Sequence, residues 1–154
     1  MKFDQQNTGA LANRHNCSFA LMDLANLISN DVNGGPSINQ LNGKQCISGD
    51  DAVININPTP KTIDAIFATS SKKTIYTEFK FNVRSIKKIE SQSNDVSEKV
   101  NRSQVHFGTP NQVIVLIYQN DNGNQVKNRL SKLLLPKFGA NCVLFPQEFV
   151  NRFF

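Results

Sequence analysis

The chain has 154 residues and a mass of 17.2 kDa, which suits one domain built around one hydrophobic core. Its hydrophobic content of 39% and its charged content of 19% exclude a disordered protein. The formal net charge of +5 favours an anionic partner such as nucleic acid, and no run approaches the roughly 20 apolar residues of a membrane span.

The N-terminal third predicts one helix and one strand. Residues 1–14 are polar, and we expect them to be loose. Between Ser18 and Ser29 the apolar residues fall on one helical stripe, which ends before the Gly-Gly-Pro sequence at 34–36. Residues 36–50 are rich in Asn, Gly and Ser, as long loops are. Residues 52–57 then alternate like a first strand, which Pro58 ends.

Two runs in the middle of the chain, 61–68 and 73–81, show the alternation of half-buried strands. In the second run one face is mostly apolar, and the other carries Tyr76, Glu78 and Lys80. A basic and then polar stretch, 83–94, follows. We expect a helix over 95–107, which Asp95 could cap and which Gly108 would terminate.

The C-terminal third predicts a strand, a helix, a strand and a helix. Residues 112–118 form a continuous apolar run, typical of a strand buried on both faces. Apolar spacing predicts a helix over 126–135 that Pro136 and Gly139 end, a short strand over 142–145, and a last helix beginning at Pro146. We therefore predict one α/β (α+β) domain over 1–154. Its mixed central sheet would join an antiparallel meander to parallel strands reached by crossovers.

The three cysteines indicate neither a metal site nor a disulfide framework. Cys17, Cys46 and Cys142 are far apart, odd in number and in no C-x-x-C pair, so we expect reduced thiols. The first residues lack the apolar core of a signal peptide. These features predict a cytoplasmic protein, or one delivered into the cytoplasm of a target cell.

The two central runs place an acid on each of two neighbouring strands. In an antiparallel pair the numbers of opposed residues have a constant sum, and a turn centred on Ser71 makes that sum 142. Asp64 then lies opposite Glu78, with Cβ atoms about 4.5–5.5 Å apart, and Lys80 lies one diagonal step away on the same face. The register depends on the length of the turn, because a slip of one residue would separate the acids.

Opposed carboxylates repel each other and need a compensating cation. Mg²⁺, or Mn²⁺ in its place, prefers oxygen ligands and keeps several waters. Asp64 and Glu78 could bind such an ion, with the backbone carbonyl of Phe79 as a third ligand. Lys80 could then orient or deprotonate a metal-bound water, or hold a phosphate. The alternative interpretation is a solvated sheet face with a weak surface ion pair between Asp64 and Lys80.

Ile63-Asp64 followed by Glu78-Phe79-Lys80 resembles the acid and E-x-K motifs of the PD-(D/E)XK nuclease superfamily, which has the restriction-endonuclease-like fold. The predicted order of helix, three strands, helix and strand over about 16–119 is also similar to that family's αβββαβ core, here with C-terminal helices added. The resemblance implies that Asp64 and Glu78 bind the metal and that Lys80 assists catalysis.

The chain departs from the family pattern at its accessory positions. Ile63 replaces the proline, and no glutamate precedes Glu78 to serve as the acid on the first helix. Three acids could substitute for it: Asp23, Asp50 and Asp51. Four residues could supply the Gln or Lys frequent on the following helix: Gln104, Lys99, Lys87 and Lys88. Three basic residues after the E-x-K strand could bind phosphates beside the cut: Arg84, Lys87 and Lys88.

The sequence thus predicts a small metal-dependent endonuclease of nucleic acid, with DNA favoured over RNA as the substrate, that does not bind membranes. A bacterial toxin domain is one setting for such an enzyme; it would have an inhibitor or immunity protein as partner and could cleave tRNA. A restriction or resolvase role would call for a homodimer. The alternative is a non-catalytic interaction or immunity-type protein on the same fold. A metal-free ribonuclease based on His15 and His106 is a weaker alternative.

Overall fold

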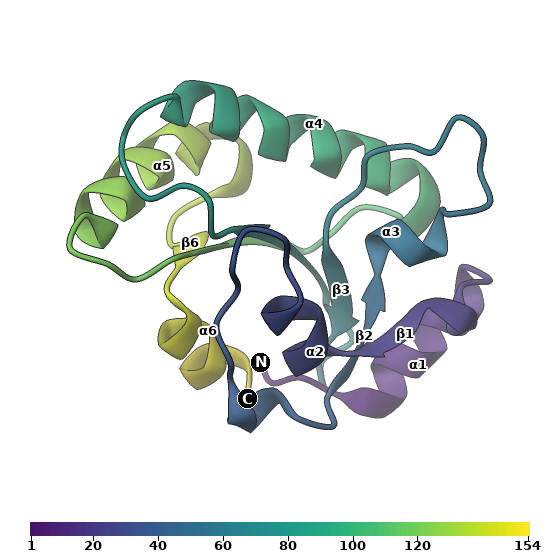
Figure 1. The fold of residues 1–154 in the computed structure, drawn as a ribbon. Helices are drawn as coiled ribbons and strands as arrows, with labels where there is room; N and C mark the ends of the chain where they lie inside the picture. Colours follow the sequence, from purple (N-terminus) through teal and green to yellow (C-terminus); the bar gives the residue numbers. More distant parts are fainter.

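Six strands form one mixed sheet in the computed structural model, which describes residues 1–154 (Figure 1). The strands are β1 (Leu21–Asp23), β2 (Gln45–Ser48), β3 (Ala65–Ala68), β4 (Thr74–Lys80), β5 (Gln112–Ile117) and β6 (Val143–Leu144). They lie in chain order, with antiparallel pairs from β1 to β4 and parallel pairs from β4 to β6. The expected meander followed by parallel crossovers is confirmed.

Helices cover both faces of the sheet, and each face has its own hydrophobic cluster. One cluster joins the sheet to α1 (Gln5–Arg14), α4 (Ile89–Phe107) and α5 (Gly123–Phe138). The other joins it to α2 (Leu24–Ser29) and α6 (Pro146–Phe153). Figure 1 shows α4 and α5 side by side as the crossovers that parallel strands require. No helix combines the length and the apolar character that crossing a membrane would demand.

The predicted register of the central hairpin is confirmed. Ala65 pairs with Thr77 and Ile66 with Tyr76, so the numbers of opposed residues sum to 142. Asp64 directly precedes β3, and Glu78 and Lys80 lie in β4. Within the strands the two faces of the hairpin separate by alternation, because Ile66 and Tyr76 join the α4 side while Phe67 and Phe79 join the α6 side. Ile63, which the alternation predicts on the side of Phe67, instead joins the α4 side, because it lies before the start of β3.

The N-terminal predictions need correction. Residues 1–14 are not loose: Asp4 caps α1, and its Oδ1 accepts a hydrogen bond of 2.7 Å from the Asn7 N–H. Thr8 also holds α1 to the sheet, because its hydroxyl oxygen accepts a 2.9 Å bond from the Ala68 N–H. The helix predicted over 18–29 is divided into a 3₁₀ turn (Ser18–Ala20), β1 and the short α2. Pairing of β1 with β2 overrides the helical spacing there.

The segment between α2 and β3 was also predicted wrongly. The expected loop at 36–50 contains a 3₁₀ turn (Asn39–Leu41), β2 and the start of α3 (Gly49–Ala52). The strand expected over 52–57 does not form, because α3 occupies its start and Ile54 and Ile56 are exposed. Ser48 caps α3, accepting a hydrogen bond from the Asp51 N–H.

Two later boundaries differ from the predictions. Helix α4 begins at Ile89, so Asp95 lies inside it and does not cap it. Helix α5 runs on through Pro136 to Phe138 before Gly139, which takes a positive φ of 78°. The short strand β6 and a final helix with Pro146 in its first turn form as predicted.

Candidate functional site

A cleft of about 380 Å³ opens beside the ends of β3 and β4. Its lining comes from α2 and the loop after it, the junction of β2 and α3, the β3–β4 hairpin and α4. The lining side chains are mainly polar: Asn30, Asp31, Asn33, Ser48, Asp50, Asp64, Glu78, Lys80, Asn82 and Lys99, with Leu27, Val32 and Phe79 as apolar members. Four carboxylates against two ammonium groups leave this cleft formally negative in a chain whose net charge is +5.

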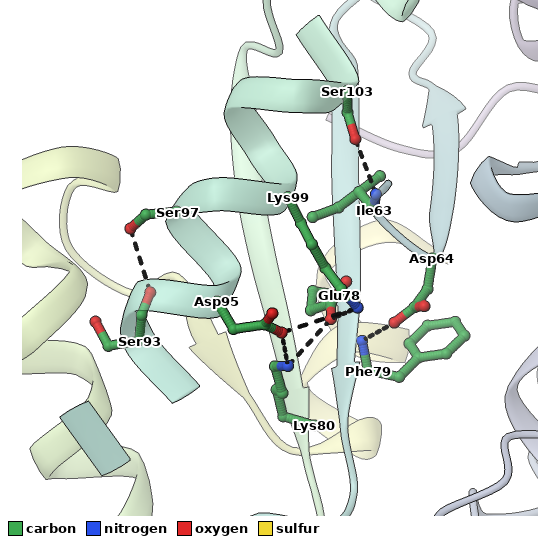
Figure 2. A network of polar contacts seen from close by, with 10 residues as sticks. All are labelled: Ile63, Asp64, Glu78, Phe79, Lys80, Ser93, Asp95, Ser97, Lys99 and Ser103. Carbon is green, nitrogen blue, oxygen red and sulfur yellow. Dashed lines mark hydrogen bonds and ion pairs between the residues drawn. The ribbon is translucent and has the colours of Figure 1, made fainter. Parts of the chain in front are cut away.

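Asp64 and Glu78 lie next to each other in the cleft. The backbone N–H of Phe79 donates a 2.6 Å hydrogen bond to Asp64 Oδ2, which ties the first acid to the strand that carries the second (Figure 2). Burial and the charge of Glu78 raise the pKa of Asp64 well above its usual value. Glu78 is completely buried, and its Oε2 atom has no hydrogen-bond partner.

Two lysines share the other carboxylate oxygen of Glu78. Lys99 Nζ lies 2.5 Å from Glu78 Oε1, and Lys80 Nζ lies 3.3 Å from the same atom. Lys80 Nζ is closer to Asp95 Oδ2, at 2.6 Å, whereas Lys99 Nζ is 4.0 Å from that oxygen. Figure 2 shows Asp95 and Lys99 reaching down from α4 toward β4. The four side chains therefore form one alternating network of charges.

The network shifts the pKa of two of its members. Burial would raise the pKa of Asp95, but the hydrogen bond and charge of Lys80, with the charges of Lys99 and Lys61, hold it below its ordinary value. Burial would lower the pKa of Lys99, but the charges of Glu78 and Asp64 raise it. Both groups therefore stay charged at neutral pH.

A buried hydrogen bond positions the start of β3 against α4. The backbone N–H of Ile63 donates to Ser103 Oγ at 2.8 Å, and both residues are completely buried. Because Ile63 directly precedes Asp64, this contact sets the first acid relative to the helix that carries Lys99. Figure 2 shows these contacts on one side of α4.

The structure brings together the three residues that the sequence predicts as the site: Asp64, Glu78 and Lys80. Phe79 also lines the cleft, but the contact that it makes with an acid uses its backbone N–H. The role of its carbonyl as a metal ligand stays a prediction.

Of the accessory candidates, some lie away from the cleft. Asp23 caps α2 and accepts a 2.6 Å bond from the Gly43 N–H. Asp51 lies in the first turn of α3 outside the cleft lining, whereas its neighbour Asp50 is part of the lining. Gln104 lines a different cavity, and Lys99 is the residue of α4 that enters the cleft. His15 and His106 are not part of the cleft lining.

The three basic residues proposed to bind phosphates do not line the cleft. Arg84 is held in place by the protein, since its guanidinium carbon lies 4.0 Å from the centre of the Tyr118 ring and its Nε donates a 3.0 Å bond to the Phe81 carbonyl. Lys87 and Lys88 are exposed in the segment before α4. Phosphate binding by these residues stays a prediction.

Asp95 was missed as a site residue, because its place in the sequence suggested a helix cap. The available signal was the helical spacing of Asp95 and Lys99, which puts two charged residues beside the buried Val96 and Val100 on the side of α4 that faces the sheet. Charged residues that recur on the apolar side of a helix indicate oppositely charged side chains on the strand or helix that packs against that side.

No group of three or more His, Cys, Asp or Glu side chains is arranged to hold a metal ion. The adjacent carboxylates of Asp64 and Glu78 are enough for Mg²⁺, because that ion usually retains several waters and takes only one or two carboxylate ligands from the protein. Comparisons with family models, curated proteins and solved structures found no match to this chain.

Proposed function

We propose that the protein is a metal-dependent endonuclease that hydrolyses phosphodiester bonds, and we favour DNA over RNA as its substrate. The observation that carries the proposal is the adjacency of Asp64 and Glu78 in a polar cleft, with Lys80 beside them. The shared register of β3 and β4 creates this adjacency.

The carboxylates suit a divalent cation. Glu78 Oε2 is buried without a hydrogen-bond partner, and the pKa of Asp64 is raised by burial and by the charge of Glu78. A cation that prefers oxygen ligands would give Glu78 Oε2 a partner and would offset the repulsion between the two carboxylates. Asp64 and Glu78 would hold Mg²⁺ or Mn²⁺, which would lower the pKa of a bound water and offset charge that develops on the phosphate.

Lys80 is suited to act on the scissile phosphate or on the attacking water. Its side chain is only 7% exposed, and Asp95 holds its ammonium group 3.3 Å from Glu78. An ammonium in such a sheltered position interacts with a developing oxyanion more strongly than one in bulk water. Lys80 can therefore donate hydrogen bonds to a phosphate oxygen as negative charge builds there.

The charge of the cleft makes cation binding a condition for binding nucleic acid. The lining has more carboxylates than ammonium groups, so a phosphodiester backbone would be repelled from the cleft without an added cation. The basic excess of the chain lies elsewhere on its surface and would attract the rest of the polyanion. We therefore expect cleavage to depend on a divalent cation.

The arrangement of elements also supports the proposal. An antiparallel β2–β3–β4 meander, the α4 crossover and a parallel β5 follow the order of the αβββαβ core that the sequence resemblance implied. The acid before β3 and the E-x-K of β4 fall at the expected points of this order. The family assignment stays a proposal that the topology supports.

A plasmid-nicking assay tests the proposed function. Supercoiled DNA is incubated with the protein and Mg²⁺ or Mn²⁺, with and without EDTA, and single-stranded DNA and tRNA are tested in parallel. We expect nicking only when the cation is present. Glu78→Gln and Lys80→Met should reduce the rate by roughly 100-fold or more, as loss of a group that stabilises transition-state charge does.

Lys127→Met is the matched control, because it also removes a lysine from an ion pair. Lys127 lies on α5, and its Nζ is 2.5 Å from Glu148 Oε1, outside the cleft lining. Its activity should equal that of the original chain. Cleavage that persists in EDTA, or in both cleft variants, would exclude the metal mechanism. If circular dichroism shows folded protein and no substrate is cleaved, the result favours the alternative of a non-catalytic interaction or immunity-type protein.

A further inference from the structure

The carboxylate of Glu78, which the proposed function assigns to a metal, is contacted at its Oε1 atom by an ammonium group, while its Oε2 atom has no hydrogen-bond partner. Lys99 Nζ lies 2.5 Å from Oε1, closer than Lys80 Nζ at 3.3 Å. Glu78 is completely buried, and a buried carboxylate without a compensating charge is strongly destabilising. Lys99 therefore supplies the main charge that compensates Glu78.

We propose that Lys99 is a built-in competitor for the catalytic cation, an inference that rests on the proposed function. Lys99 occupies the Oε1 atom of Glu78 and would have to withdraw when a divalent cation binds the Oε2 atom of the same carboxylate. An ammonium and a divalent cation would otherwise share one carboxylate at close range, where like charges repel each other.

The structure favours Lys99 over Lys80 as the residue that moves. Lys80 makes its shorter contact with Asp95, at 2.6 Å, and only 7% of its side chain is exposed. The Lys99 side chain is 19% exposed and lines the cleft. Lys99 Nζ is also 4.0 Å from Asp95 Oδ2, so a small shift gives it another carboxylate partner.

This competition has a functional consequence. The cation must displace an ammonium group, so its affinity is lower than the two carboxylates alone would provide. A displaced Lys99 remains at the cleft, where a phosphate group would be a favourable new partner. Cation binding and substrate binding would then strengthen each other, because each favours the same position of Lys99.

Titration with Mn²⁺ in the absence of nucleic acid tests the proposal. Binding is measured by calorimetry and by loss of the free Mn²⁺ signal in electron paramagnetic resonance. Lys99→Met and Lys99→Gln should bind Mn²⁺ roughly 10- to 100-fold more tightly, the range expected for removing one competing charge-assisted contact. Lys99→Arg retains the positive charge, and Lys127→Met leaves the cleft unchanged, so both should bind like the original chain.

Thermal unfolding gives a second measurement that does not depend on activity. In EDTA, Lys99→Met and Lys99→Gln should unfold at lower temperature, because Glu78 loses its closest positive partner. Saturating Mn²⁺ should raise the unfolding temperature of these two variants more than that of the original chain. The Gln variant retains a hydrogen-bond donor and so remains informative if the Met variant does not fold.

The outcomes separate this inference from the proposed function. Equal or weaker Mn²⁺ binding by both folded Lys99 variants, with binding by the original chain intact, would overturn the competition and leave the nuclease proposal standing. Absence of Mn²⁺ binding in every protein would overturn both. Tighter binding in Lys99→Met and Lys99→Gln, but not in Lys99→Arg, would support the competition.

Discussion

Replacement of Ser103 by alanine should destabilise the protein by leaving a buried backbone donor unpaired. Ser103 Oγ accepts a 2.8 Å hydrogen bond from the Ile63 N–H, and neither residue is exposed to solvent. Loss of a buried partner costs about 1–3 kcal/mol, because the remaining group was desolvated without compensation. For a domain of this size each kcal/mol lowers the unfolding temperature by about 2–4 °C, so Ser103→Ala should lower it by roughly 2–12 °C.

Ser97→Ala is a control on the same helix. The Ser97 hydroxyl donates a 3.2 Å bond to the Ser93 carbonyl one turn earlier, and both side chains are largely buried. Its removal leaves no backbone N–H unpaired, and alanine is the better helix former, so the free energy of unfolding should change by less than about 0.5 kcal/mol. Both variants are compared by urea unfolding followed by circular dichroism, with the slope of the transition checked for constancy.

Equal stability losses in Ser103→Ala and Ser97→Ala would contradict the proposed role of the Ser103 hydroxyl. If Ser103→Ala loses no more stability than Ser97→Ala, then the Ile63 N–H has another acceptor, and α4 does not fix the start of β3. In that case Asp64 would not be held relative to Lys99 in the way that the structure indicates.

Two further predictions concern the core and the charge network. Phe67→Ala should lower the free energy of unfolding, measured in urea, by about 3–5 kcal/mol. The centre of the Phe67 ring lies 5.8 Å from that of Phe3 and 5.4 Å from that of Phe153, so this ring joins both ends of the chain to β3. A loss below about 1 kcal/mol would contradict this packing. The pKa of Asp95 is lowered in the folded state, so its contribution to stability is fully present above its unfolded value and is lost as the pH falls through the folded value. The stability difference between the original chain and Asp95→Asn should therefore be constant near neutral pH and vanish in the acid range. A difference that persists at the lowest measurable pH would show that the ion pair with Lys80 is not its source.

The hairpin that carries the candidate site could be predicted because its physical signal is local. Side chains alternate every second residue in a strand, and the short turn leaves few registers for β3 and β4. The opposition of Asp64 and Glu78 follows from that register. The buried β5 and the final helix were likewise recognisable, since a continuous apolar run and a proline in the first helical turn each have one dominant interpretation.

The N-terminal half was not predictable in the same way, because its elements are short and depend on their partners. β1 and β2 have only three and four residues, and pairing with each other and with β3 stabilises them more than their own sequence does. The helical spacing across 18–29 and the strand-like alternation of 52–57 are real patterns, but tertiary pairing and solvent exposure override both.

The sequence alone was therefore sufficient to predict that Asp64 and Glu78 lie side by side with Lys80 next to them. The alternation of side chains along a strand places these residues on one face. The partners of that pair depend on the fold. Asp95 and Lys99 come from a helix that begins after the hairpin and crosses back over it, and Asp50 comes from a turn before β3. Contacts of this kind join separate elements, so no periodicity within either element specifies them.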